Sequence, residues 1–177
     1  MESYNVDWQR VRERRLRADY RKLQELVQCS DLIAIERVMG DPPESYIIRY
    51  SCKGIESVGV MGPTYRTLHR VLIEMPLDYP NQMPRMRWLT PIFHPNINNG
   101  GTRVCIDTWY ASKFLDDLCL MLGRMIQYQN YNPYNALRSD AADWSIQHAH
   151  LLPVDRQPLQ RGSTEESQPD DIAIRFL

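Results

Sequence analysis

Apolar residues recur at helical spacing close to the start of the chain. Across residues 7–28, side chains of one kind repeat at i, i+4, i+7 and i+11, a spacing typical of an amphipathic α-helix. This apolar stripe consists of Leu16, Tyr20, Leu23 and Val27. A basic stripe with the same spacing consists of Arg10, Arg14, Arg17 and Arg21. At about 3.6 residues per turn the two stripes lie on different sides of the helix, so the pattern predicts a core-facing side and a separate basic face.

Strand-like runs separated by turn signals occupy the middle of the chain. The predicted strands are 32–40, 45–55, 65–76 and 87–93. The segments between them contain Gly-Asp-Pro-Pro, the Gly-rich VGVMGPT and the Pro-punctuated LDYPNQMPRM, all of which favour turns and loops. Because the connections are short and no helical pattern lies between the runs, we predict a four-stranded antiparallel meander.

Helical patterns return in the second half of the chain. Residues 115–128 carry a broad apolar face, which predicts a well-buried helix, and 137–149 are expected to form a shorter one with Ser139 as a candidate N-cap. The order of helix, meander and further helices predicts an α+β layer fold. We place this domain at residues 1–150.

The composition changes after that domain. Residues 153–171 are rich in Pro, Gln, Ser and acidic residues, so we expect the tail 151–177 to be loosely ordered. Its last residues, IAIRFL, alternate again and could pair with a sheet edge of this chain or of another.

Length and composition narrow the class of protein. With 177 residues, 43% of them hydrophobic, the chain is long enough for one domain with a substantial core. The formal net charge of -1 gives no sign of nucleic-acid binding. No apolar run approaches the ~18 residues of a membrane span, and the N-terminus lacks the apolar region of a secretory signal. We therefore expect a cytoplasmic protein with neither a nucleic-acid nor a membrane partner.

Cysteine and histidine spacing gives little support for a metal site. The four cysteines are Cys29, Cys52, Cys105 and Cys119. Their wide, irregular spacing contains no C-x-x-C pair, so reduced and mostly buried thiols are favoured. His148 and His150 form an H-x-H pair, but no Cys or carboxylate stands at a convincing ligand spacing. We expect no metal and no cofactor.

The stretch 79–107 combines a loop, a turn and one of these cysteines. Its sequence, YPNQMPRMRWLTPIFHPNINNGGTRVCID, resembles the active-site signature of ubiquitin-conjugating (E2) enzymes. That signature has a Tyr-Pro-x-x-x-Pro loop, a strand, His-Pro-Asn, a Gly-containing loop, and Cys followed by an apolar residue and Asp. The matching residues are Tyr79, Pro80, Pro84, His94, Pro95, Asn96, Cys105, Ile106 and Asp107. The order of elements matches over about residues 7–150, and NPYNAL resembles the turn after the family's crossover helix.

The resemblance implies a conjugating enzyme that carries a ubiquitin-like modifier as a thioester on Cys105. The modifier would pass from that thioester to an amine, a lysine of a target protein. Such a carrier needs a nucleophilic sulfur in an exposed loop. Transfer passes through an oxyanion, for which the Asn96 amide is an obvious donor worth ~3 kcal/mol. Alternatively Asn96 braces the loop through backbone hydrogen bonds, and the matching Asn of the family has been assigned both roles.

Residues around the cysteine are expected to support it. The resemblance implies that His94 is a structural hydrogen bonder, since a strong base beside the thiol would also favour hydrolysis of the thioester. Pro95 stiffens the turn, and Asp107 shapes the surroundings of the thiol while its charge opposes thiolate formation. Asn135 stands where the family often has Asp or Ser near the incoming amine. It could orient a lysine or only cap the turn, and Tyr134 lies beside it.

The predicted partners are the modifier, an E1-like activating enzyme and a target protein. The basic face of the first helix is either solvated surface or a docking surface for an acidic partner. By resemblance to the family, that partner would be the E1-like enzyme, bound at Arg10, Arg14, Arg17 and Arg21. Two departures make a RING ligase doubtful: TWYASKFLDD lacks the family's Trp-Ser-Pro, and Asn81 replaces a large apolar residue. RYSCKGI and TPIFHPNI are similar to E2-like proteins of bacterial ubiquitin-like conjugation operons, some of which serve in antiviral defence.

Two other functions compete with a conjugating enzyme. One is a non-catalytic member of the same fold that binds ubiquitin-like proteins, although such variants usually lack the cysteine. The other is a cysteine hydrolase that pairs Cys105 with His94 or His69, although no Asn- or Asp-oriented His motif is evident. Formation of a reductant-sensitive adduct with E1, modifier and ATP would separate these functions.

Overall fold

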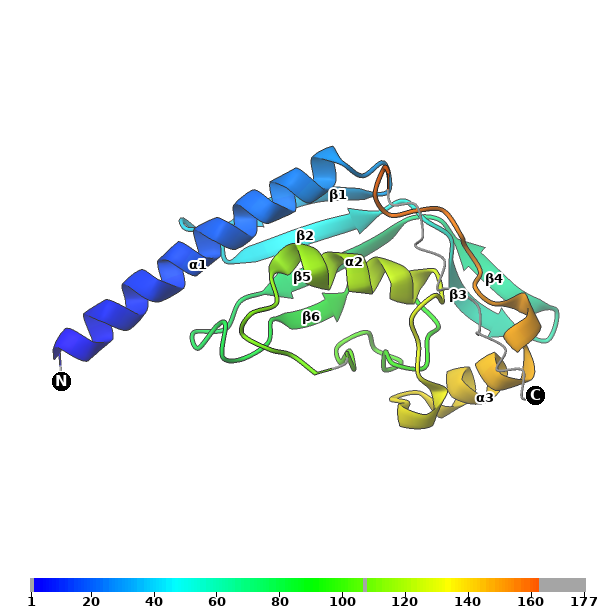
Figure 1. The fold of residues 1–177 in the computed structure, drawn as a ribbon. Helices are drawn as coiled ribbons and strands as arrows, with labels where there is room; N and C mark the ends of the chain where they lie inside the picture. The colour runs from blue at the N-terminus through cyan, green and yellow to red at the C-terminus, as the bar shows by residue number, and fades with distance from the viewer. Residues whose placement is uncertain (1, 107, 163–177) are drawn as a thin grey trace, which may run out of the picture.

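The computed structural model describes residues 2–106 and 108–162, with side chains from residue 7 onward. Its elements are α1 (Glu2–Gln28), β1 (Ile33–Met39), β2 (Ser45–Tyr50), β3 (Gly54–Gly59), β4 (Gly62–Arg66), β5 (His69–Glu74), β6 (Arg85–Trp88), α2 (Leu115–Ile126), η1 (Pro133–Asn135), α3 (Ser139–Gln147) and η2 (Ala149–Leu151). The predicted α+β fold with an N-terminal helix and C-terminal helices is confirmed (Figure 1).

A four-stranded antiparallel sheet forms the centre of the domain. Its order is β1-β2-β5-β6, and the inward-facing side chains of β2 alternate with exposed or half-exposed ones. Tyr46, Ile48 and Tyr50 are fully buried, and the Tyr50 hydroxyl donates to the Cys119 carbonyl oxygen of α2 at 3.0 Å. Helix α1 runs along β1 and β2 (Figure 1). The predicted four-stranded antiparallel sheet is therefore confirmed.

A β-hairpin, β3–β4, interrupts the meander between its second and third strands. We predicted single strands at 45–55 and 65–76 with a turn between them, and these boundaries are wrong. β2 ends at Tyr50, the chain leaves the sheet, and β5 begins only at His69. A Cβ atom at Gly54 would lie 2.7 Å from Ile126 Cγ2, so the backbone packs closely against α2 where the chain enters the hairpin. The sequence concealed the hairpin because its strands, GIESVG and GPTYR, contain few apolar residues.

Helix α1 packs through the predicted apolar stripe. Leu16 and Leu23 are fully buried, and Tyr20 and Val27 are partly buried against the same core. Arg12 and Arg15 also turn toward the domain, where Arg12 bonds the Pro76 carbonyl and Arg15 bonds Asp19. The helix begins at Glu2, five residues before the predicted start at residue 7.

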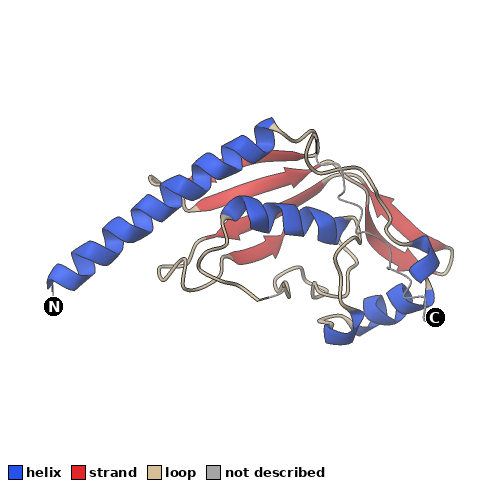
Figure 2. Cartoon of the chain, in the orientation of Figure 1, coloured by secondary structure: helices blue, strands red, loops and turns tan. Residues whose placement is uncertain are grey.

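A second, smaller core joins the hairpin to the C-terminal helices. It contains Ile55, Phe93, Tyr128, Ala141, Trp144 and Val154. Ser139 is the first helical residue of α3 and not its N-cap, which is Arg138. Figure 2 shows α3 and the two strands of the hairpin at one end of the molecule, remote from the start of α1.

Residues 151–162 are the part of the predicted tail that the structure describes. Val154, Asp155 and Leu159 are buried, and the Arg161 amide donates to the Cys29 carbonyl oxygen. This segment is therefore packed on the domain, although its composition predicted loose order, because two apolar side chains fill sites on the core. IAIRFL and its predicted edge pairing lie outside the described residues.

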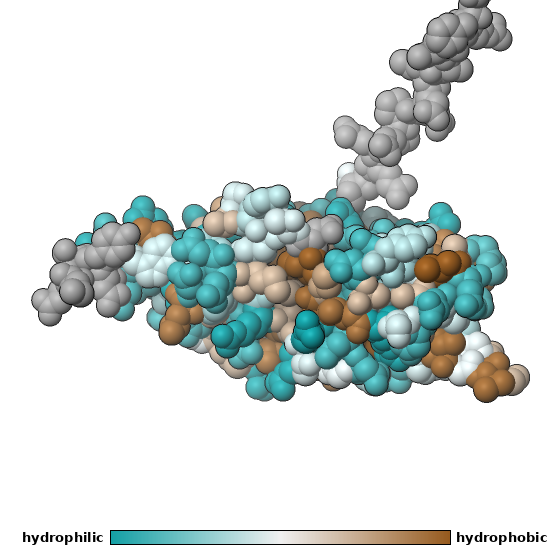
Figure 3. Space-filling model, turned by 90° about the horizontal axis from the view of Figure 1, so that it is seen from below, coloured by the Kyte–Doolittle hydropathy of each residue, from teal (hydrophilic) through white to brown (hydrophobic). Residues whose placement is uncertain are grey.

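None of the described helices combines the length and apolar character that crossing a bilayer requires. Seen from below, the surface mixes polar groups with several small apolar patches, one of which lies near the centre of the view (Figure 3).

Candidate active site

The loop after β6 folds back on itself and brings Cys105 beside the His-Pro-Asn turn. Ile97 and Val104 form an isolated antiparallel bridge, and the Cys105 amide donates to the Asn96 carbonyl oxygen at 2.8 Å. Gly101 makes the reversal with φ +65°, and a Cβ there would lie 2.8 Å from Trp88 Cβ. Both its conformation and its space require glycine at this position.

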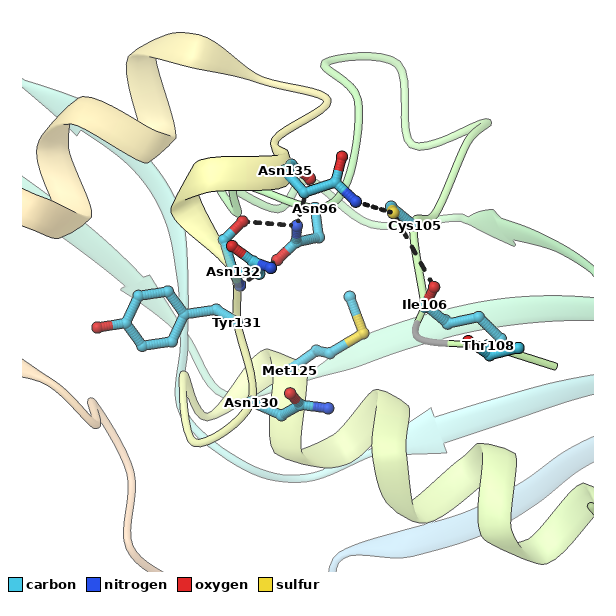
Figure 4. A pocket seen from close by; sticks show the side chains of 9 residues that line it. All are labelled: Asn96, Cys105, Ile106, Thr108, Met125, Asn130, Tyr131, Asn132 and Asn135. Carbon is cyan, nitrogen blue, oxygen red and sulfur yellow. Dashed lines mark hydrogen bonds between the residues drawn. The ribbon is translucent and has the colours of Figure 1, made fainter.

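Cys105 lies at the edge of a pocket of about 320 Å³. The pocket is lined by Asn96, Cys105, Ile106, Thr108, Met125, Asn130, Tyr131, Asn132 and Asn135 (Figure 4). Four of these nine residues are asparagines, and Cys105 itself is partly exposed. A sulfur that borders open space, with hydrogen-bond donors beside it, has the setting that a covalent carrier site requires.

Asn135 reaches the thiol directly. It ends η1, whose N-cap Asn132 accepts a hydrogen bond from the Tyr134 amide. The Nδ2 atom of Asn135 lies 3.8 Å from Cys105 Sγ, and Figure 4 shows this amide nitrogen pointing at the sulfur. Two residues separated by thirty positions in the chain therefore meet at the site.

Asn96 holds the turn that carries Asn135. Its Nδ2 donates to the Asn132 carbonyl oxygen at 2.9 Å and to the Asn135 carbonyl oxygen at 3.0 Å. Its Oδ1 accepts from the Asn132 amide at 2.8 Å. Both amide protons and the carbonyl of Asn96 are thus engaged with the backbone of residues 132–135. The sequence left two roles open for Asn96, an oxyanion donor and a brace for the loop. Its contacts in this structure are those of the brace.

His94 and Pro95 support this turn through hydrogen bonds. His94 is fully buried, and its Nδ1 accepts a hydrogen bond from the Asn96 amide at 3.1 Å. Burial lowers its pKa to about 3, an effect that a backbone interaction with Asn130 partly opposes. A neutral imidazole with its Nδ1 occupied supports a structural role for His94 and argues against a Cys–His pair. The Pro95 carbonyl oxygen accepts from the Leu137 amide at 2.8 Å and so connects the His-Pro-Asn turn to the segment before α3.

Neither Tyr134 nor the four predicted arginines of the first helix line the pocket. Tyr134 precedes Asn135 but its side chain is 88% exposed, and it does not line the pocket. Asp107 lies outside the described residues. The four arginines of the basic stripe are exposed on α1, where Arg17 pairs with Asp41 at 3.4 Å.

The remaining cysteines differ from Cys105 in their surroundings. Burial raises the pKa of Cys52 and of Cys119 to about 12, so both stay protonated at neutral pH. Cys29 is exposed, but it follows α1 and is not among the residues that line the pocket. Of the four thiols, Cys105 alone combines partial exposure with a position in the pocket.

Sequence reasoning missed two of the amides and one buried network. Asn130 and Asn132 could have been suspected from the density of asparagine in NYNPYN, but no motif singled them out. Arg15, which lies outside the predicted basic stripe, bonds Asp19 and the carbonyls of Ala111 and Lys113 in the loop after the cysteine.

No metal site emerges from the part of the chain that the structure describes. Within residues 2–106 and 108–162, no three His, Cys, Asp or Glu side chains gather so as to hold an ion. His148 stacks on Trp144 with ring centroids 4.7 Å apart, and its Nδ1 lies 2.9 Å from the Trp144 carbonyl oxygen. This nitrogen already has a protein partner.

An α+β domain that holds a partly exposed thiol against a His-Pro-Asn turn has the architecture of a ubiquitin-conjugating domain. The family model described as "Ubiquitin-conjugating enzyme" matches residues 55–151. The chain belongs to this family, as the sequence predicted.

Individual relatives agree with this assignment. Ubiquitin-conjugating enzyme E2 13 of Saccharomyces cerevisiae is 31% identical over 119 residues, covering 62% of this chain and 76% of the yeast protein. Ubiquitin-conjugating enzyme E2 N of Drosophila melanogaster is 29% identical over 97 residues, covering 52% of this chain. The match spans 62% of the fly protein, less than two thirds of its length.

Solved structures agree at the level of the fold. A structure described as a novel ubiquitin-conjugating enzyme superimposes with a TM-score of 0.57 at 21% identity, over 77% of this chain and 86% of that one. The E2 domain of a Toxoplasma gondii ubiquitin-conjugating enzyme gives a TM-score of 0.55 at 21% identity, over 79% of this chain and 90% of that one.

Proposed function

We propose that this protein is an E2-type transferase that carries a ubiquitin-like modifier as a thioester on Cys105. The observation that carries the proposal is the position of the Cys105 thiol, partly exposed and 3.8 Å from the Asn135 amide, at the edge of an amide-lined pocket. Family membership supports the same chemistry.

Two acyl transfers make up the proposed reaction. In the first, the Cys105 thiolate attacks the thioester carbonyl of a modifier held by an E1-like enzyme, a new C–S bond forms, and the E1 thiolate leaves. In the second, a neutral lysine amine of the target attacks the carbonyl carbon on Cys105. A C–N bond forms, the C–S bond breaks, the Cys105 thiolate leaves, and the amine loses its proton to water. The thiol is regenerated, so the protein acts as a carrier and needs no cofactor.

The E1-like enzyme is proposed to dock on the basic face of α1. Arg10, Arg14, Arg17 and Arg21 are exposed, whereas the other side of the helix is buried.

We further propose a ubiquitin-like modifier and a target protein as partners, a cytoplasmic location and a link to bacterial operons. Asn81 argues against a RING ligase as partner, because a polar side chain stands here in place of a large apolar one; it is exposed and bonds Asp78 at 3.3 Å. The same loop exposes Leu77, so it retains some apolar surface for a partner.

A charging assay tests the proposal. The protein is incubated with an E1, a ubiquitin-like modifier and ATP, and adducts are separated with and without reductant. The wild type should form a reductant-sensitive adduct, and Cys105→Ser should form a reductant-stable ester or none. Cys29→Ser is the matched control, because it changes the other accessible thiol and should still form the labile adduct.

Two outcomes would contradict the proposal. A reductant-sensitive adduct on Cys105→Ser would place the carrier thiol elsewhere. If no adduct forms with any E1 and modifier pair while the modifier still binds, the protein is a non-catalytic binding domain. The hydrolase alternative would require release of free modifier from conjugates. It is disfavoured by the buried, neutral His94 and by His69, whose Nε2 lies 3.0 Å from the Arg66 carbonyl oxygen.

A further inference from the structure

The two asparagines nearest the thiol differ in how many of their amide protons are free. Asn96 donates both Nδ2 protons, one to the Asn132 carbonyl oxygen at 2.9 Å and one to the Asn135 carbonyl oxygen at 3.0 Å. Turning one of them toward a reacting group would leave a backbone carbonyl without its donor, which is unfavourable in a pocket wall. Asn96 is also 95% removed from solvent, being only 5% exposed.

The Asn135 side chain has the opposite character. It is exposed, and within residues 2–106 and 108–162 its amide has a single partner, Cys105 Sγ at 3.8 Å. The backbone of Asn135 is fixed by Asn96, but its side-chain protons are not committed to the fold. It is a donor that is held in position and remains available.

The geometry points to Asn135 as the residue that stabilises the oxyanion in the proposed thioester chemistry. This inference rests on the proposed function, because the oxyanion exists only once an acyl group is bonded to Cys105. The oxygen on a carbon bonded to Sγ lies roughly 3 Å from the sulfur, and an effective donor lies roughly 3 Å from that oxygen. The Nδ2 atom of Asn135 lies 3.8 Å from Sγ. Both distances can therefore be met by an oxygen that lies to one side of the line between Sγ and Nδ2. Asn96 then acts as a positioning residue, which sets the backbone of the donor.

The step is simple in terms of bonds. When the amine attacks, the carbonyl π electrons move to oxygen, and the Asn135 N–H donates to the resulting oxyanion. As the C–S bond breaks, the carbonyl re-forms and the same N–H can return to the Cys105 thiolate. No proton leaves Asn135 at any stage. The amine loses its proton to water, so Asn135 is a hydrogen-bond donor and not a base.

A different role for Asn135, orienting the lysine amine, predicts the opposite response to a carboxylate. For Asn135→Asp, an amine-orienting role predicts retained or faster transfer, because a carboxylate attracts and can deprotonate the amine. An oxyanion donor predicts slower transfer than Asn135→Ala, because a negative charge would face the developing oxyanion. The identity of the nucleophile gives a second criterion. Hydroxylamine is already neutral at pH 7 and needs no orientation by the lysine subsite, yet its attack forms the same oxyanion.

The experiment is single-turnover discharge. Wild type, Asn135→Ala and Asn135→Asp are loaded to completion with E1, modifier and ATP, the E1 is stopped, and loss of thioester is followed with free lysine and with hydroxylamine. We expect Asn135→Ala to lose about 100-fold with both nucleophiles, and Asn135→Asp to lose more. Asn130→Asp places the same charge on the same pocket without a bond to the thiol, and measures how much of the loss is charge alone. Melting temperatures should be unchanged for the Asn135 variants, since among the described residues that side chain bonds only the thiol.

The outcomes separate this inference from the proposed function. If the variants load and then discharge to both nucleophiles at the wild-type rate, Asn135 is not the donor, although the carrier function stands. If only lysine discharge falls, or if Asn135→Asp is as fast as wild type, Asn135 orients the amine. If the wild type never loads, the proposed function fails and this inference fails with it.

Discussion

The Tyr79 hydroxyl donates a 2.7 Å hydrogen bond to Asp19 Oδ2 and thereby ties the loop before β6 to helix α1. The other oxygen of Asp19 accepts from the Leu115 amide at 2.9 Å, and Arg15 bonds the same carboxylate at 2.9 Å. Arg15 also donates to the carbonyls of Ala111 and Lys113. One buried carboxylate therefore joins the helix proposed to dock the E1 with the loop that follows the cysteine.

Removing either partner of this contact should destabilise the domain. Tyr79→Phe should lower the free energy of unfolding by about 2 kcal/mol, because a hydrogen bond to a charged group is lost. Asp19→Ala should lower it by about 3–5 kcal/mol, because Arg15 and the Leu115 amide lose their buried acceptor. Urea denaturation at pH 7 measures both. Tyr110→Phe is the matched control, since Tyr110 is 58% exposed and should change little. Equal stability of all variants would show that the network adds no net stability.

Thiol labelling should divide the cysteines into two pairs. In the native protein, a thiol-specific chromogenic reagent at pH 8 should react rapidly with Cys29 and Cys105. Cys52 and Cys119 should react only after denaturation, because they are buried and their pKa values are raised to about 12. Rapid reaction of all four thiols under native conditions would contradict this description of the core.

Asn96→Ala should affect stability and activity together. The substitution removes three hydrogen bonds to the backbone of residues 132–135, so we expect a loss of about 1–3 kcal/mol and weaker hydrogen-exchange protection in that turn. Discharge of the thioester should slow because the donor on Asn135 is displaced. Asn135→Ala serves as the comparison, since it should slow discharge without loss of stability. A fully stable Asn96→Ala variant with slow discharge would return the oxyanion role to Asn96.

Charge reversal on α1 should weaken loading in a salt-dependent manner. Arg10, Arg14 and Arg17 changed together to Glu should slow E1-dependent charging most at low salt, because exposed charges act mainly through steering. Each contact is worth ~0.5–1 kcal/mol, and the difference from wild type should shrink toward 1 M salt. The fold should be unaffected, since the only described ion pair among the three is the exposed Arg17–Asp41 contact. Equal charging rates at low salt would show that the basic face is solvated surface and that the E1 docks elsewhere.

Stability should fall as the pH drops below 6.5. Burial lowers the pKa of His94 to about 3 and that of His69 to about 4, so both stay neutral in the fold while the unfolded chain takes up their protons. Their contribution is complete above the unfolded pKa of about 6.5 and is lost at ~1.4 kcal/mol per pH unit for each His as the pH falls. Asp19, whose pKa is raised by burial, titrates with the opposite sign. His69→Gln should therefore reduce the slope between pH 6 and pH 4.5, measured by urea denaturation. An unchanged slope would mean that His69 is not buried as a neutral group.

The sequence alone determined the family, the main sheet and the stripe of α1. Each of these depends on signals that are local or of fixed period: the spacing of Leu16, Tyr20 and Leu23, the alternation in β2, and the residues of the active-site motif. Local patterns of this kind are set by backbone geometry and by the need to bury one face, so they can be read without knowing the rest of the fold.

Only the tertiary structure decided how the site is assembled. The hairpin β3–β4 has weakly apolar strands, and residues 153–162 have the composition of a loose segment, yet both are held by packing against distant parts of the chain. The same is true of Asn96, whose amide is committed to carbonyls 36 and 39 residues further along. No periodicity records such a pairing, because its geometry depends on how α2 and η1 return the chain to the thiol. The division between a bracing Asn96 and an available Asn135 therefore belongs to the folded protein and not to the motif.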